Sequence, residues 1–355
     1  MGWTKKEFWL AFLVTLTFLL IGMVGLEIGL AILRPSPVQP DTLLGWRLKE
    51  NFQRQFPQST LGGKAYLASF RTNESGLRTF GGSGRAPVTV LVLGDSFTAD
   101  PYASNDRMWY ASMTERLAQR MQRPVRDFEV LAGGAGGWGT YQNLLLAQSL
   151  SRTIKPDLFV LQFCSNDFQN NSYEWESQGV VRGQYMRRPF ASMGAQHPMY
   201  APGIAGAIYR SWLGQSRLLN KIDGLVGGVQ LKSQGGYIRP LPPDVAAAYE
   251  RDSLALTKML LVELRRTFKS TPAAVMVNCD GNETGPNRFW KLLAREAGFI
   301  PVSAPSDFLR SLNPSQRADY LHADGSHLSE DGNLAYGAVA GDAIASLNLT
   351  PPYRK

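Results

Sequence analysis

The sequence is poor in the residues that build metal centres and disulfide frameworks. Its 355 residues include two cysteines, Cys164 and Cys279, and three histidines, at positions 197, 322 and 327. Two cysteines are too few for a disulfide scaffold, and no Cys/His cluster has the spacing of zinc ligands. The sequence therefore implies no metal and no organic cofactor, and chemistry that needs an imidazole has few candidates.

Charge is missing from the N-terminal segment, where no charged residue occurs between Phe8 and Leu26. This stretch is mostly Leu, Phe, Val, Ile and Ala, and its length suits an α-helix that crosses the hydrocarbon layer of a membrane. A cleaved signal peptide is the alternative, but its apolar core is usually shorter and followed by small residues. We expect residues 1–33 to be a retained single-pass anchor. Lys5 and Lys6 before it favour a cytoplasmic N-terminus, which places the remaining chain on the periplasmic side.

Acidic residues are scarce between positions 181 and 240, where eight Lys or Arg face one Asp. Such a segment suits anionic lipid headgroups or an acidic polysaccharide, or it is an ordinary solvated surface. Nucleic acid is disfavoured, because no zinc-finger or RNA-binding signature accompanies the charge. Apolar residues from Ile204 to Val226 share one helical stripe, with basic residues opposite. The stripe predicts a helix packed on a sheet, or a basic amphipathic helix that lies on a membrane or covers the site as a lid.

Short apolar runs alternate with segments of helical spacing through the rest of the chain. The runs that predict strands are residues 88–93, 126–131, 157–163, 273–277 and 299–302. Strands that alternate with helices predict an α/β fold with a central parallel sheet covered on both faces.

The domain organisation follows from composition. Residues 34–70 are expected to be a linker and an irregular lead-in, because three prolines between 35 and 40 favour extended chain and the following residues are polar. The main domain is expected over residues 71–349, with a basic insertion at about 168–243.

A possible nucleophile and its base stand at opposite ends of this domain. Gly94-Asp95-Ser96 directly follows the first predicted strand. Ser96 is therefore expected at the carboxyl edge of the sheet, where open α/β sheets bind ligands. A serine hydroxyl needs a base, and the base needs an acidic group to orient it. Asp324, three residues before His327, offers that pair, although a lone Asp-x-x-His can also simply shape a turn.

Two further motifs offer hydrogen-bond donors to an oxyanion. The glycine-rich segment 133–139 follows the second strand, and Gly136, Gly137 and Gly139 are each possible backbone donors. Asn166 follows the third strand in Ser165-Asn166-Asp167 and offers its side-chain amide. Taken singly, the glycine segment is also explained as a turn and Asn166 as a loop cap.

The four motifs, in this order, resemble the four blocks of the SGNH (GDSL-type) hydrolase family, and the segment 71–78 is similar to one in its membrane-anchored bacterial members. The resemblance covers roughly residues 70–345. It implies a flavodoxin-like three-layer sandwich. The chain departs from the family pattern at Cys164, where glycine is usual, and at Ala132, where asparagine is common.

Carried over to this sequence, the resemblance assigns five residues. It makes Ser96 the nucleophile, His327 the base and Asp324 the group that orients the base, and it makes Gly137 and Asn166 the oxyanion donors.

The resemblance also implies an activity. It implies a serine esterase, and the anchor points to an ester, O-acyl, bond of a cell-envelope glycan or lipid. One alternative is an O-acetyltransferase acting on an exopolysaccharide. A second alternative is a catalytically inactive glycan-binding or scaffold protein.

The two cysteines are expected to be buried and reduced. The flavodoxin-like fold that the resemblance implies has the strand order 2-1-3-4-5. In this order the third and fourth strands are neighbours about 4.8 Å apart, and they end near Cys164 and Cys279. Side chains on neighbouring parallel strands point the same way rather than at each other, and this geometry disfavours a disulfide even in an oxidising compartment.

Overall fold

Five parallel strands form the centre of the structure. The computed structural model describes residues 4–33, 35–84, 86–99, 101–179, 185–193, 197–211, 214, 216–234, 241–278, 285–347 and 349. The parallel strands are β6 (Val88–Gly94), β7 (Phe128–Gly134), β8 (Leu158–Phe163), β9 (Ala273–Val277) and β10 (Ile300–Val302). The full sheet has the order β10-β9-β8-β6-β7-β5, so the parallel strands follow the order 2-1-3-4-5. The edge strand β5 (Arg78–Gly81) pairs antiparallel with β7 and was not predicted.

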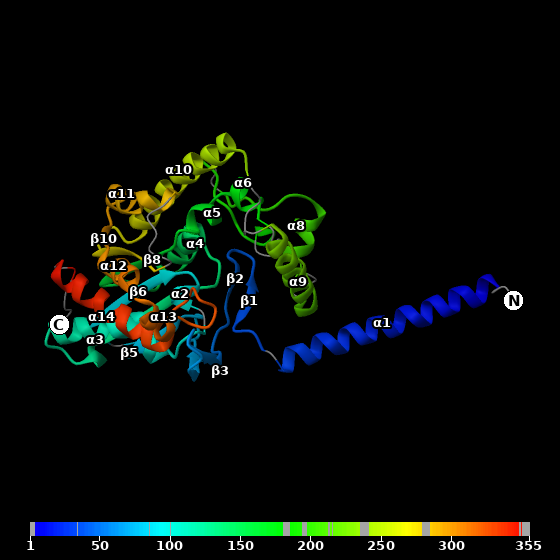
Figure 1. Ribbon diagram of the computed structural model, residues 1–355, viewed down its shortest axis with the longest axis horizontal. Coiled ribbons are helices and arrows are strands. Elements are labelled where there is room, and N and C mark those ends of the chain that lie inside the picture. The colour runs from blue at the N-terminus through cyan, green and yellow to red at the C-terminus, as the bar shows by residue number, and fades with distance from the viewer. Residues whose placement is uncertain are drawn as a thin grey trace.

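Two layers of helices cover the sheet, as Figure 1 shows. Alternate residues of a strand point to opposite faces, and β6 shows this plainly: Leu91 and Leu93 belong to one buried cluster, Val90 and Val92 to the other. The first cluster includes residues of α4 (Thr140–Leu150), α10 (Pro243–Thr267) and α11 (Trp290–Glu296). The second includes residues of α3 (Trp109–Arg120), α12 (Ala304–Ser311) and α14 (Glu330–Ser346). The predicted fold class, a three-layer α/β sandwich, is confirmed.

Shorter helical segments connect these layers. They are α2 (Ser96–Ala99), η1 (Asn105–Arg107), η2 (Val125–Asp127), α5 (Asp167–Asn171), α6 (Tyr173–Glu176), η4 (Gly285–Phe289) and α13 (Pro314–Tyr320).

Helix α14, which follows the Asp-x-x-His motif, packs tightly on α3. A Cβ atom at Gly337 would lie 2.1 Å from the carbonyl oxygen of Trp109, so only glycine fits this crossing. The helix begins where the Ser329 hydroxyl accepts a hydrogen bond from the amide of Gly332 (3.2 Å). The cap and the close crossing together fix the loop that carries His327.

The prediction of an irregular lead-in was wrong, because residues 38–71 form two antiparallel hairpins. The first pairs β1 (Val38–Asp41) with β2 (Gly45–Leu48), and the second pairs β3 (Gln53–Ser59) with β4 (Ala65–Arg71). Two-stranded ribbons bury little apolar surface, and Pro57 within β3 is tolerated because an edge strand leaves one row of amides unpaired. For this reason the polar sequence of β3 lacks the apolar pattern that would have predicted a strand.

The apolar stripe of the basic insertion is divided between two helices rather than one. These are α8 (Gly203–Arg210) and α9 (Arg217–Gln234), and the chain turns extended at Ser211 between them. The expectation of one helix packed on the sheet is therefore wrong, since Ile204 on α8 is 81% exposed. Trp212, a member of the predicted stripe, lies outside the described residues.

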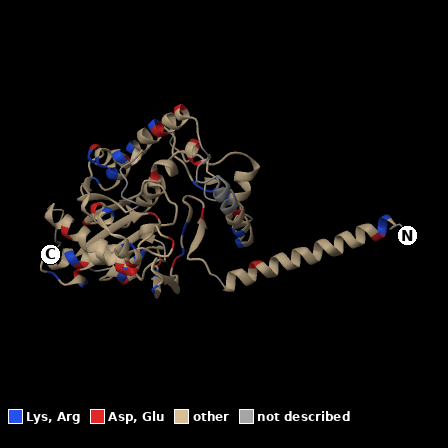
Figure 2. Ribbon diagram, viewed as in Figure 1, with Lys and Arg blue, Asp and Glu red and all other residues tan. Residues whose placement is uncertain are grey.

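Helix α1 (Lys5–Leu33) extends away from the α/β domain (Figure 1). It is long and apolar enough to span a membrane, a property that signal sequences share. Figure 2 shows its charges confined to the two ends, with an uncharged stretch between them.

Cys164 is buried, as predicted, but the prediction of a reduced thiol was wrong there, because Cys164 is disulfide-bonded. Cys164 follows the last residue of β8, and the last ladder pair is Phe163 with Val277. The side chain therefore stands beyond the sheet, where the rule that neighbouring side chains point the same way no longer holds. Cys279, the other cysteine of the chain, lies outside the described residues.

A buried ion pair lies within the insertion, and its arginine also contacts residues outside the insertion. Arg188 Nη2 lies 3.3 Å from Glu176 Oε1, and both side chains are 1% exposed. Arg188 also donates to Gln142 of α4 (2.6 Å), and its guanidinium lies 5.2 Å from the ring centroid of Trp46. Removing one partner of such a pair leaves the other charge buried and uncompensated.

We therefore expect Arg188→Ala to lower the free energy of unfolding by about 3–5 kcal/mol. The control is Arg266→Ala, which removes the exposed partner of Glu263 and should change stability little. Urea unfolding of the detergent-solubilised chain measures both. Equal losses in the two variants would show that the Arg188 pair is no more important than a surface pair.

Candidate active site

The nucleophile motif lies at the carboxyl end of β6. Gly94 ends the strand, and a Cβ atom there would lie 2.3 Å from Gln162 Oε1, so glycine is required. The same oxygen accepts hydrogen bonds from the Asp95 amide and the Thr98 hydroxyl, both at 3.0 Å. These contacts anchor the turn from which Ser96 begins the short helix α2.

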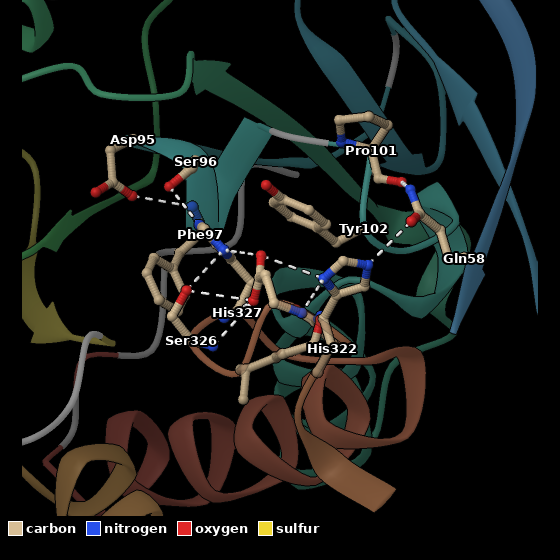
Figure 3. A network of polar contacts seen from close by, with 12 residues as sticks. Gln58, Asp95, Ser96, Phe97, Pro101, Tyr102, His322, Ser326 and His327 are labelled. Carbon is tan, nitrogen blue, oxygen red and sulfur yellow. Dashed lines mark hydrogen bonds and ion pairs between the residues drawn. The ribbon is translucent and has the colours of Figure 1, made fainter. Parts of the chain in front are cut away.

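Ser96, His327 and Asp324 form one chain of hydrogen bonds (Figure 3). His327 Nε2 lies 2.8 Å from the Ser96 hydroxyl oxygen, and His327 Nδ1 lies 2.7 Å from Asp324 Oδ2. The two motifs, more than 220 residues apart in sequence, therefore meet with the spacing of a nucleophile, its base and an orienting carboxylate.

The carboxylate of Asp324 is held as an anion. Burial raises its pKa, but hydrogen bonds from the side chain and backbone of His327 and from the backbone of Ser326 outweigh this effect and lower the pKa below its ordinary value. An anionic Asp324 accepts the Nδ1–H of His327. The tautomer so selected presents the lone pair of Nε2 to the Ser96 hydroxyl as a hydrogen-bond acceptor.

Two aromatic rings enclose the imidazole of His327. The ring centroid of Phe97 lies 4.6 Å away, and that of Tyr102 lies 4.3 Å away in a stacked arrangement. The ring is thus held on both sides as well as through its two nitrogens.

Asn166 lies at the site, whereas Gly137 stands back from it. Asn166 lines the same cavity as Ser96 and His327, and its Oδ1 is buried without a hydrogen-bond partner among the described residues. Gly137 has a φ of +75°, which favours glycine, and its carbonyl accepts a hydrogen bond from Asn170 (3.2 Å), but Gly137 is not among the residues that line the cavity. The structure thus brings three of the five predicted site residues, Ser96, Asn166 and His327, to one cavity, and Asp324 is hydrogen-bonded to His327 outside its lining.

The cavity has a volume of about 380 Å³ and walls of two kinds. The polar wall includes Asn278, whose Oδ1 accepts a hydrogen bond from the Tyr336 hydroxyl (2.7 Å) and whose Nδ2 is buried without a partner in the described part of the chain. Arg317 also lines it. The apolar wall consists of leucines: Leu309, Leu312, Leu321 and Leu328.

Sequence reasoning missed the residues that surround the triad. His322 could have been identified from the sequence, because it precedes Asp324 by two residues in His-x-Asp-x-x-His. Tyr102, Gln58 and Asn278 carry no local signal, since each reaches the site from a different loop or strand.

Metal-ligand chemistry finds no support in the described residues, where no group of three or more His, Cys, Asp or Glu side chains could hold an ion.

Two buried carboxyls lie beneath the site. Burial raises the pKa of Asp95 to about 6, although hydrogen bonds and the nearby His327 oppose the shift. Burial, and then the charge of Asp95, raise the pKa of Asp167 well above its ordinary value. Asp167 accepts hydrogen bonds from the Thr140 hydroxyl (2.8 Å) and the Cys164 amide (3.3 Å). These bonds link the start of α4 to the residue that follows β8.

Fold and site together define the class: an α/β enzyme with a serine, histidine and aspartate at the carboxyl ends of a parallel sheet. The model of the GDSL-like Lipase/Acylhydrolase family matches residues 92–335 of the chain. The protein belongs to this family and is an ester-hydrolysing enzyme.

Comparison with curated protein sequences finds no match. Among solved structures the chain is similar to TesA, with 15% identity over 73% of this chain and 99% of that one (TM-score 0.39). It is also similar to a family 3 carbohydrate esterase of Clostridium thermocellum, with 13% identity over 73% and 96% of the two chains (TM-score 0.39). A third is Axe2, an acetylxylan esterase of Geobacillus stearothermophilus, with 15% identity over 75% and 94% (TM-score 0.38).

The raised pKa of Asp95 predicts a specific pH dependence of stability. The folded state binds this proton more tightly than the unfolded state, so the contribution of Asp95 is complete below pH 3.8 and is lost as the pH rises to about 6. Asp95→Asn removes this loss. The free energy of unfolding of the variant should therefore rise by about 2 kcal/mol relative to the wild type between pH 4 and pH 7.

Urea unfolding at the two pH values measures this difference. Asp342→Asn, which removes an exposed carboxylate paired with Arg120, corrects for the loss of one negative charge. If the free energy of unfolding of Asp95→Asn differs from that of the wild type by the same amount at pH 4 and pH 7, Asp95 has the same pKa in the folded and unfolded states.

Proposed function

We propose that the protein is a membrane-anchored serine esterase that hydrolyses an O-acyl ester of a cell-envelope glycan or lipid. Ser96 is the nucleophile, His327 its base, and Asp324 the group that orients the base. The observation that carries this proposal is the unbroken hydrogen-bond chain from the Ser96 hydroxyl through His327 to Asp324.

In the first half of the reaction Ser96 is acylated. Its oxygen attacks the ester carbonyl carbon, and its proton passes to His327 Nε2, which lies 2.8 Å away. Asp324 stabilises the imidazolium that forms. The bond between the carbonyl carbon and the alcohol oxygen then breaks, and the alcohol leaves with the proton from His327.

In the second half the acyl group is released. A water molecule gives one proton to His327 and adds to the acyl carbon, and Ser96 recovers its proton as the acid departs. A glycan hydroxyl in place of water would transfer the acyl group instead, which is the acetyltransferase alternative.

Charge that develops on the carbonyl oxygen needs fixed donors. Asn166 supplies its Nδ2 in this proposal, because it lines the cavity beside Ser96. The backbone amide of Ser96 is the second donor in this proposal, whereas Gly137, which does not line the cavity, is left out of it. Asn278 offers a further donor, since its Nδ2 is otherwise unpaired among the described residues and its oxygen is held by Tyr336.

The two walls of the cavity suit the two parts of an ester. Four leucines offer an apolar surface for an acyl chain, and Asn278 and Arg317 offer polar contacts to a hydroxylated or anionic alcohol part. Helix α1 would hold this cavity at the periplasmic face of the membrane, where envelope glycans and lipids are within reach.

We expect Ser96→Ala to lower kcat for a chromogenic acyl ester by about 10³-fold or more, because the acyl-enzyme cannot form. A fluorophosphonate probe should label the wild type and not this variant. Ser165→Ala, which removes another serine from the lining of the same cavity, is the matched control and should retain both activity and labelling. Undiminished labelling of Ser96→Ala would reject Ser96 as the nucleophile.

A further inference from the structure

A second histidine contacts the carboxylate of the triad. His322 Nδ1 lies 3.2 Å from Asp324 Oδ2 and 3.3 Å from the Asp324 amide nitrogen. On its other side, His322 Nε2 lies 3.0 Å from Gln58 Oε1 (Figure 3). His322 therefore links Asp324 to a residue of strand β3.

The contacts of Gln58 decide which nitrogen of His322 carries a proton. Gln58 Nε2 donates to the carbonyl of Pro101 (2.8 Å), so the amide oxygen is the group that faces His322. An oxygen can only accept, and Nε2 of His322 must therefore be protonated. Neutral His322 then accepts the Asp324 amide N–H at Nδ1, and protonated His322 donates from Nδ1 to the carboxylate. His322 holds Asp324 in either state.

The hairpin that carries Gln58 is itself paired with the loop of the triad. The Ala323 amide donates to the Ser59 carbonyl (2.9 Å), and the Leu61 amide donates to the Leu321 carbonyl (2.8 Å). Tyr102 packs against both imidazoles, with its ring centroid 4.6 Å from that of His322. The loop with Asp324 is thus braced by residues far from it in sequence.

We infer that Gln58 and His322 are positioning residues for the esterase reaction, acting through Asp324 on the orientation of His327. This inference rests on the proposed function of Ser96, His327 and Asp324. Asp324 needs such a brace because its side chain is one-third exposed on a short loop. Neither residue touches the reacting atoms, so loss of the brace affects turnover rather than substrate binding.

The test compares Gln58→Leu, His322→Ala and the double variant in ester hydrolysis. Each single change should lower kcat about tenfold with KM within about twofold of the wild type, the size of one lost hydrogen bond. In this inference Gln58 acts on the reaction through His322, so the double variant should be no slower than His322→Ala. His322→Asn, which keeps a nitrogen donor near the Nδ1 position, should recover part of the loss.

The control is Gln55→Leu, an exposed glutamine of the same strand, which should leave kcat unchanged. The low-field proton resonance of the His327 Nδ1–H···Asp324 bond gives a readout besides activity, and it should shift or broaden in Gln58→Leu. Unchanged kcat and an unchanged resonance in both single variants would overturn the inference, as would multiplicative losses in the double variant. An inactive wild type would reject the proposed function instead, and the resonance would still test the brace.

A separate set of observations concerns the exposed apolar side chains of α8 and α9. Leu225 is 69% exposed, and Ile222 and Val226 lie beside it at the i, i+3 and i+4 positions of one face of α9. Ile204 and Ile208 form a similar pair on α8. We call these five residues the α8–α9 apolar surface. Apolar groups gathered in this way mark a surface that contacts something other than water.

Hydrogen bonds join the start of α9 to the C-terminal part of α1, the candidate anchor. Glu27 of α1 accepts hydrogen bonds from the backbone amides of Arg217 (2.7 Å) and Leu218 (3.0 Å) and from the Ser216 hydroxyl (2.9 Å). The carboxylate thus satisfies amides at the N-terminus of α9. Arg217 in turn donates to the carbonyl of Leu30 (3.1 Å). Glu27 directly follows the uncharged stretch of α1, so α9 begins at the level where α1 would leave the bilayer.

The direction and charge of α9 fit a membrane surface. In Figure 1 α9 runs across the direction of α1 rather than along it, as a helix in the interface plane would. Figure 2 shows basic residues at the end of α9 nearest α1, where Arg217 and Lys221 lie one turn apart. Basic residues beside an apolar face suit anionic headgroups.

We propose that the α8–α9 apolar surface lies in the headgroup region of the membrane that α1 enters, so that the protein contacts the bilayer at two places. The second contact fixes the distance and tilt of the catalytic domain above the membrane.

Spin labels in the full chain, reconstituted in nanodiscs with anionic lipid, test this. A spin label at Leu225→Cys should be relaxed by oxygen more than by a water-soluble nickel chelate. A label at Leu292→Cys, an exposed position of α11, should show the reverse. A label at Phe18→Cys reports on the anchor itself, and the parent chain is the labelling blank.

The outcomes test the surface contact and the membrane anchor separately. Nickel access at position 225, with position 18 in lipid, would overturn the surface contact and leave the anchor standing. Shielding of position 225 from both reagents would show that protein covers the surface, which also overturns the proposal. Nickel access at position 18 would reject the anchor.

Discussion

The hydrogen bond between Asp324 and His327 is the interaction on which the site depends. In the proposed mechanism it selects the tautomer of His327 that takes a proton from Ser96, and the lowered pKa of Asp324 keeps that tautomer favoured. Both residues lie on a loop of few residues, which cannot hold such geometry alone. Helix α14, the rings of Phe97 and Tyr102, and the β3–β4 hairpin each restrain it from a different side.

The N-terminal hairpins are therefore part of the enzyme rather than a spacer between anchor and domain. Trp46 of β2 lies against the buried Arg188, and Gln58 of β3 reaches His322. The same region follows α1 directly. In our proposals the anchor, the hairpins and the α8–α9 apolar surface form one connected support that sets both the position of the domain at the membrane and the geometry of its catalytic loop.

The strands, and the positions of Ser96 and Asn166 at one edge of the sheet, could be predicted because their signals are local. Buried parallel strands appear as short apolar runs, and the residues that follow them must gather at one edge of the sheet. Ser96 and Asn166 were found in this way. The hairpins were missed because two-stranded ribbons carry little apolar periodicity, and the state of Cys164 was misjudged because that residue stands beyond the ladder whose geometry was applied to it.

The sequence by itself determined the α/β class and singled out the serine, histidine and aspartate as candidates, because each is encoded by residues next to one another or by one repeated pattern. The strand order followed from the family resemblance. Only the tertiary structure decided which side chains surround them. Gln58, Tyr102 and His322 meet because the β3–β4 hairpin pairs with the loop before α14, across more than 250 residues. No local pattern records such a contact, since its free energy depends on where the whole fold places the two segments.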